Sequence, residues 1–110
     1  MTKTEHETRG ILHAAAKAAT EAQVEARAAV AIAYLIHDDD LDERAEREFG
    51  NARHDHDDAV ERLADLESRY SGMDAATGYA EAGRLLERIG ETLNRVRRLR
   101  SEANEKRRRH

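Results

Sequence analysis

The segment ARHDHDDAV, residues 52–60, carries two histidines and three aspartates at consecutive positions. Imidazole and carboxylate groups bind metals and exchange protons near neutral pH, so the cluster suggests a metal or acid–base site. On a helix, however, successive residues turn by about 100°, which places His54 and His56 on nearly opposite sides. Only His54 and Asp58, four residues apart, share a face, and His54 and the aspartates are expected to lie on or near the solvated side of the helix. Because a zinc site needs three or four protein ligands, we interpret this pair as a solvated helical pair, and we expect no metal, no cofactor and no catalytic residue.

His56 falls into an apolar stripe in the same projection. We therefore predict that it is a polar residue within a helix-packing seam, where it sets the register of neighbouring helices. A pH-responsive interface is the alternative. If the second and third helices form a hairpin about Tyr70–Tyr79, His56 faces Leu93, and Asn94 supplies the hydrogen bond that a buried imidazole needs.

The composition favours long helices. The 110 residues are 39% hydrophobic, 38% charged and 4% aromatic, with no proline and no cysteine. Such a profile is typical of helical bundles and coiled coils. The lack of cysteine excludes disulfides, thiolate metal sites and a cysteine nucleophile. The longest apolar run, residues 28–36, is far shorter than the roughly 20 residues that span a membrane, and the N-terminus is polar, so we expect a cytoplasmic protein with no membrane contact.

Two segments are expected to separate the helices. HDDDLDE, residues 37–43, offers three aspartates that can cap a helix N-terminus. YSGMD, residues 70–74, places Gly72 where a helix commonly ends, and Ser71 with Asp74 matches a capping pattern. We therefore predict a single all-α domain over residues 1–110, with helices near 4–36, 39–70 and 74–106 in an elongated antiparallel bundle.

Each predicted helix has an apolar seam. In the first helix the seam is rich in alanine, and in the other two it alternates at spacings of three and four. The seam positions are Leu12, Ala15, Ala19, Ala22, Ala26, Ala29 and Ala33; Ala45, Phe49, Ala52, His56, Ala59, Leu63, Leu66 and Tyr70; and Tyr79, Ala82, Leu86, Ile89, Leu93 and Val96. The third seam is expected to fail at Arg97 and Arg100.

The core formed by these seams would be thin, because alanine buries little area. Long, alanine-lined bundles often complete their cores by self-association. The end of the first helix is apolar on all sides, so it requires cover. We expect a homo-oligomer or a protein partner to contact Ile32, Tyr34, Leu35 and Ile36.

Three of the glycines inside the helical pattern have an expected structural role. Gly83 and Gly90 are expected to mark close helix packing or a kink, since glycine in a helix costs about 1 kcal/mol relative to alanine. Gly50, followed by Asn51, is expected to break or bend the second helix.

The C-terminus is basic. Residues 95–110 contain eight arginines and lysines against two glutamates. One interpretation is internal pairing with the acidic start of the second helix, with residues 100–108 beside residues 41–49. The alternatives are contact with nucleic acid or with an acidic protein, because clustered arginines neutralise phosphates and carboxylates. The candidate contact residues are Arg97, Arg98, Arg100, Lys106, Arg107, Arg108 and Arg109.

The sequence reveals no specific activity, and no small-molecule substrate is expected. The features above predict a non-enzymatic helical interaction or assembly protein that is oligomeric. Its size and composition are those of accessory factors or inhibitors from phages and mobile elements. The alternative is a nucleic-acid-associated protein that uses the C-terminal arginine cluster.

Overall fold

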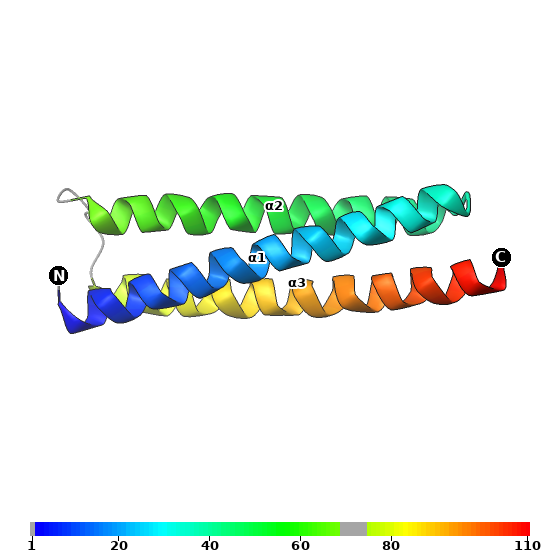
Figure 1. Ribbon diagram of the computed structural model, residues 1–110. Helices are drawn as coiled ribbons and strands as arrows, with labels where there is room; N and C mark the ends of the chain where they lie inside the picture. Colours follow the sequence, from blue (N-terminus) through cyan, green and yellow to red (C-terminus); the bar gives the residue numbers. More distant parts are fainter. Residues whose placement is uncertain (1, 69–74) are drawn as a thin grey trace.

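The computed structural model describes residues 2–68 and 75–110, and within them the fold is all-α, as predicted. Three helices are present in these residues: α1 (Lys3–Leu35), α2 (Asp39–Glu67) and α3 (Ala75–Arg109). They form a rod of 55 × 18 × 15 Å (Figure 1). Helix α2 is antiparallel to α1 and α3, so α1 and α3 run in parallel and the N- and C-termini lie at opposite ends of the rod.

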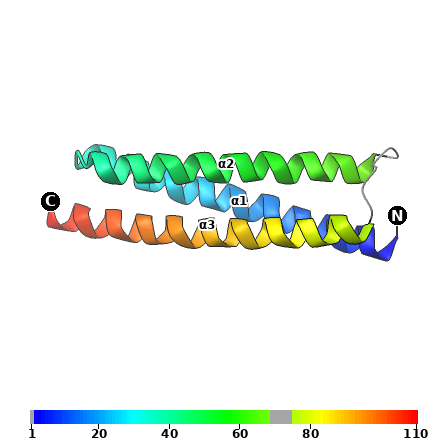
Figure 2. The same ribbon diagram turned by 180° about the vertical axis from the view of Figure 1, so that it is seen from behind.

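The three helices do not pack equally against one another. Helix α1 contacts α2 and α3 to the same extent, whereas α2 and α3 contact each other much less. In Figure 1 α1 crosses in front of the other two, and in Figure 2 the same bundle seen from behind shows α2 and α3 with α1 beyond them. Helix α1 is therefore the shared packing partner that holds the bundle together.

The predicted seam of α1 is the buried side of that helix. Its members Leu12, Ala15, Ala19, Ala22, Ala26, Ala29 and Ala33 are all at most 2% exposed. Alanine has the highest helix propensity, and its single methyl group lets two helix backbones approach closely. We call the six alanines at positions 15, 19, 22, 26, 29 and 33 the α1 alanine ridge.

Larger side chains fill the core at the two ends of the ridge. Ile32, Ile36, Leu41 and Leu99 are buried near the α1–α2 turn, and Leu12, Leu85 and Ile89 are buried toward the other end. The seam of α3 continues through Leu99 and Ala103, so the expectation that it fails at Arg97 and Arg100 is wrong. The reason is that the spacing of three and four continues unbroken through Leu85, Thr92 and Leu99, so the buried side of α3 bypasses Arg97 and Arg100.

The turn between α1 and α2 takes only three residues. His37 adopts a left-handed conformation with φ 55°, and the backbone N–H of Asp38 donates to the carbonyl of Ala33 at 3.0 Å, which closes the C-terminus of α1. Of the three candidate capping aspartates, Asp38 is the N-cap of α2, because its carboxylate accepts from the N–H of Leu41 at 3.0 Å. Its neighbours Asp39 and Asp40 lie in the first turn of α2.

The other predicted boundary is only partly described. Helix α2 ends at Glu67 and α3 extends to Arg109, three residues beyond the predicted end. The predicted capping residues Ser71, Gly72 and Asp74, and the last seam residue Tyr70, lie outside the described residues.

The interior glycines have no packing role in this structure. Helix α2 runs without interruption through Gly50 and Asn51, so the predicted break is wrong. A Cβ atom added at Gly50, Gly83 or Gly90 would meet no heavy atom of another element within 4 Å. The expectation of close packing at Gly83 and Gly90 is therefore also wrong, because both positions face open space along the helix.

Gly83→Ala and Gly90→Ala are each expected to raise the free energy of unfolding by about 1 kcal/mol, since alanine restricts the unfolded chain and meets no obstacle. Chemical denaturation followed by circular dichroism measures the change. The reciprocal control is Ala14→Gly, at an exposed position of α1, which should lower stability by a similar amount. A loss of stability in both glycine variants would contradict the open packing described above.

Candidate functional site

An exposed apolar stripe follows the outer side of α1 in its C-terminal half. Val24 is 61% exposed and Leu35 is 62% exposed, and Ala28 and Ala31 lie between them at spacings of four, three and four. At about 100° per residue, this stripe lies half a turn away from the alanine ridge. Tyr34, 74% exposed, flanks the stripe. We call Val24, Ala28, Ala31, Tyr34 and Leu35 the outer α1 face.

The apolar end predicted for the first helix is therefore divided between core and surface. Ile32 and Ile36 are each 8% exposed and belong to the core near the α1–α2 turn. Tyr34 and Leu35 remain on the surface. The guanidinium of Arg27 stacks over the ring of Phe49 on α2 at 4.8 Å, so it is directed toward α2.

Ion pairs join α2 and α3 along the whole rod. They connect helices whose direct apolar contact is small, and we call them the α2–α3 ladder. Its members are Asp38–Lys106 (2.7 Å), Arg44–Glu102, Glu48–Arg95 (2.8 Å), Asp55–Arg88 (2.8 Å) and Arg62–Glu81 (2.6 Å). Exposed ion pairs are each worth only about 0–1 kcal/mol, so the ladder fixes the register of the two helices more than it adds stability.

The ladder shifts the protonation of its members. A hydrogen bond from Arg44 lowers the pKa of Glu102, and the same pair raises the pKa of Arg44. The hydrogen bond from Lys106, together with that from the N–H of Leu41, lowers the pKa of Asp38. Asp38 therefore both caps α2 and ties it to the end of α3.

The histidine–aspartate cluster contributes to this ladder through its aspartates. Asp55 is only 5% exposed, and its Oδ1 accepts from Nε and Nη2 of Arg88 at 3.2 and 2.8 Å. Asp58 accepts from Nε of Arg62 at 2.9 Å and lies 3.4 Å from Nη2 of Arg88. The interpretation of the aspartates as belonging to a wet face is thus wrong for Asp55.

Sequence reasoning missed this arrangement because the predicted hairpin register places residue 94, and not Arg88, opposite Asp55. The signal was nonetheless present: Asp55 lies one position from His56 in the seam of the second helix, and the third helix carries an arginine every few residues. His54 is exposed, as expected for a solvated residue. Among the described residues, no group of three or more His, Asp or Glu side chains lies close enough to hold a metal ion.

His56 lies at the edge of the seam. Its side chain is 34% exposed, and its Nδ1 lies 3.8 Å from a carboxylate oxygen of Asp57. Asn94 is exposed, and within residues 2–68 and 75–110 it makes no hydrogen bond to His56. The predicted contact fails because the register differs: Asp55 pairs with Arg88, whereas the predicted hairpin places it opposite residue 94. The register role of His56 remains a prediction.

The basic C-terminus is divided among several partners. Arg97 and Arg100 pair with Glu21 and Glu25 of α1, at 3.8 and 2.9 Å, and Lys106 reaches Asp38. Arg109 pairs with Glu105 on its own helix at 2.8 Å. Within the described chain, Arg98, Arg107 and Arg108 take part in no ion pair. Much of the cluster thus pairs internally, and part of that pairing is with α1, which the sequence did not predict.

Comparisons with protein-family models, curated proteins and solved structures find no match to this chain. None of the helices in the described residues is long and apolar enough to cross a membrane. The function of this chain must therefore be inferred from the surfaces of the bundle itself.

Arg88→Gln is expected to lower the free energy of unfolding by about 1–2 kcal/mol, because it leaves the buried carboxylate of Asp55 without its cation. Arg84→Gln is the matched control, since Arg84 is exposed on the same helix and forms no ion pair among the described residues. Urea denaturation of the two variants measures the difference. Equal stability of the two variants would mean that Arg88 adds nothing to the burial of Asp55.

Stability is expected to fall as the pH drops below about 5, through the ordinary range of carboxyl groups. The pKa values of Asp38 and Glu102 are lowered in the folded chain, so the unfolded chain takes up protons at a higher pH and unfolding becomes easier. The stabilisation from these two carboxylates is fully present above their pKa values in the unfolded chain. It is lost as the pH falls through their lower pKa values in the folded chain. The double variant Asp38→Asn, Glu102→Gln should flatten the dependence of the unfolding midpoint on pH between about 5 and 3. If the slope of the unfolding midpoint against pH is unchanged in this variant, other carboxylates cause the loss of stability at low pH.

Proposed function

We propose that this chain is a non-enzymatic helical assembly protein that associates with a second copy of itself through the outer α1 face. The observation that carries the proposal is the exposure of Val24, Tyr34 and Leu35 on one side of one helix, each above 60%. Contiguous apolar surface of this kind on a soluble domain commonly marks an interaction site. The stripe also has the three–four spacing by which helices pack against one another.

Two copies of α1 fit together best when they run antiparallel about Ala28. The small side chains of Ala28 and Ala31 then allow the backbones to approach, in the manner of the alanine ridge within each chain. Val24 of one copy lies opposite the space between Ala31 and Leu35 of the other. Such a two-fold contact is isologous, so each copy uses the same residues.

Since a single helix face buries less than the standard interface of roughly 800 Å² per partner, we expect a reversible dimer with a dissociation constant in the micromolar range.

The proposal predicts a native mass that rises with concentration from the 12.4 kDa of one chain toward twice that value. Sedimentation equilibrium between about 1 and 200 µM measures it. Leu35→Glu should hold the protein at the mass of a monomer, because it places a carboxylate in the apolar contact. Val60→Glu is the matched control: Val60 is also exposed, at 47%, but lies on α2, so this variant should still dimerise.

Two results would overturn the proposal. One is a monomer at every concentration, and the other is a dimer that Leu35→Glu and Val60→Glu affect equally. A monomer that retards duplex DNA at low salt through Arg107 and Arg108 would instead support the alternative of a nucleic-acid-associated protein.

A further inference from the structure

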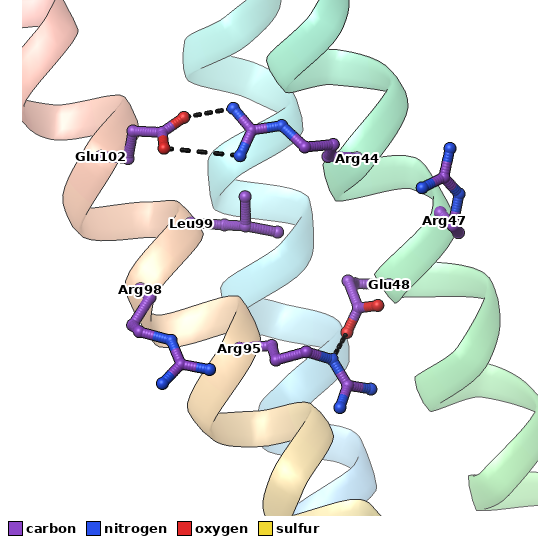
Figure 3. Close-up of a pocket in the computed structure, with 7 residues that line it drawn as sticks. All are labelled: Arg44, Arg47, Glu48, Arg95, Arg98, Leu99 and Glu102. Atoms are coloured by element: carbon purple, nitrogen blue, oxygen red, sulfur yellow. Dashed lines mark hydrogen bonds and ion pairs between the residues drawn. The ribbon is translucent and has the colours of Figure 1, made fainter.

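A groove lies on the α2–α3 side of the bundle, away from the outer α1 face. It has a volume of about 410 Å³, which is within the range of small-molecule sites. Two rungs of the α2–α3 ladder border it, Arg44–Glu102 toward the α1–α2 turn and Glu48–Arg95 about one turn of α2 away (Figure 3). Leu99 lies between these rungs in Figure 3 and supplies an apolar surface.

The groove carries an excess of positive charge. Its lining contains four arginines and two glutamates: Arg44, Arg47, Arg95, Arg98, Glu48 and Glu102. Both glutamates are already held, because Glu102 accepts from two nitrogens of Arg44 and Glu48 accepts from Nε of Arg95 at 2.8 Å. The lining alone therefore has two more arginines than glutamates, while Asp40 and Glu43, just outside it, pair with Arg44 and Arg47.

Two of the lining arginines, on different helices, have no ion-pair partner within the groove itself. Arg98 of α3 forms no ion pair within the described chain. Arg47 of α2 reaches only Glu43, at 3.4 Å, and both of these side chains are more than 60% exposed. Figure 3 shows Arg47 and Arg98 on opposite sides of the groove. Arg98 can turn toward a ligand without breaking an ion pair, whereas Arg47 must first leave its exposed pair with Glu43.

We propose that this groove binds a phosphate group, held between Arg98 and Arg47 with help from the terminal nitrogens of Arg95. A phosphate dianion offers acceptor oxygens to both guanidiniums and competes with Glu43 for Arg47. The planar fork of a guanidinium also donates two parallel hydrogen bonds to phosphate oxygens, which a lysine cannot do. The remaining volume and Leu99 leave room for a small organic group, so the chemical class is inorganic phosphate or a phosphate monoester.

The test is a titration with inorganic phosphate and with phenyl phosphate at pH 8 and constant ionic strength. Two-dimensional NMR of the arginine Nε–H groups reads each side chain separately. We expect saturable shifts of Arg98 and Arg47, and no comparable shift of Arg53 or Arg84, which are exposed elsewhere and serve as internal references. Tighter binding of phenyl phosphate would assign a monoester as the preferred ligand, whereas equal affinities would assign the free ion.

The matched variants are Arg98→Gln and Arg84→Gln, both at exposed positions of α3. Losing one charged hydrogen-bond donor should weaken phosphate binding by about tenfold or more in Arg98→Gln and leave it unchanged in Arg84→Gln. Far-ultraviolet circular dichroism confirms that both variants fold. Shifts that do not saturate, or that affect all arginines alike, would overturn the proposal, as would equal affinities of the two variants. Because the groove is on the opposite side from the outer α1 face, this outcome is independent of the dimer test.

Discussion

The close approach that alanine allows is the constraint on which this fold depends. Every member of the α1 alanine ridge is at most 1% exposed, and the ridge lets one helix pack against two neighbours at once. A wider α1 would separate α2 and α3 further and break the ladder between them. Alanine buries little area per residue, so the large side chains at the two ends of the rod, such as Leu12, Leu41 and Ile89, supply much of the apolar burial.

The apolar seams and the α2–α3 ladder specify different features of the structure. Burial of the apolar seams drives the association of the three helices, but a row of alanines packs almost equally well in several registers and therefore specifies register weakly. The pairs between α2 and α3 have defined partners, so a shift by one turn would leave the carboxylate of Asp55 unpaired at a buried position. Such a penalty opposes wrong registers even where each correct pair adds little stability.

The sequence was sufficient for the helices and for the buried side of α1, because both follow from periodicity and composition. It was insufficient for register and for the fate of individual charges. The predicted hairpin placed Asn94 beside His56, whereas the observed register brings Arg88 to Asp55, six residues earlier along α3. A hairpin centre cannot be read from seams alone, because several registers bring similar small and aliphatic side chains into contact. The outer α1 face was predicted in part, through Tyr34 and Leu35, but the same argument assigned the buried Ile32 and Ile36 to it. The groove between the two ladder rungs had no sequence signal, since its arginines come from two helices.

Because the described chain forms three long helices that alternate in direction, its two ends lie at opposite ends of a rod whose longest axis is 55 Å. Joining its termini in a circular permutant would require a linker of at least about 16 residues in extended form. Conversely, two proteins fused to the two termini would be held several nanometres apart by a stiff spacer, and the proposed antiparallel dimer would present four such attachment points, two at each end.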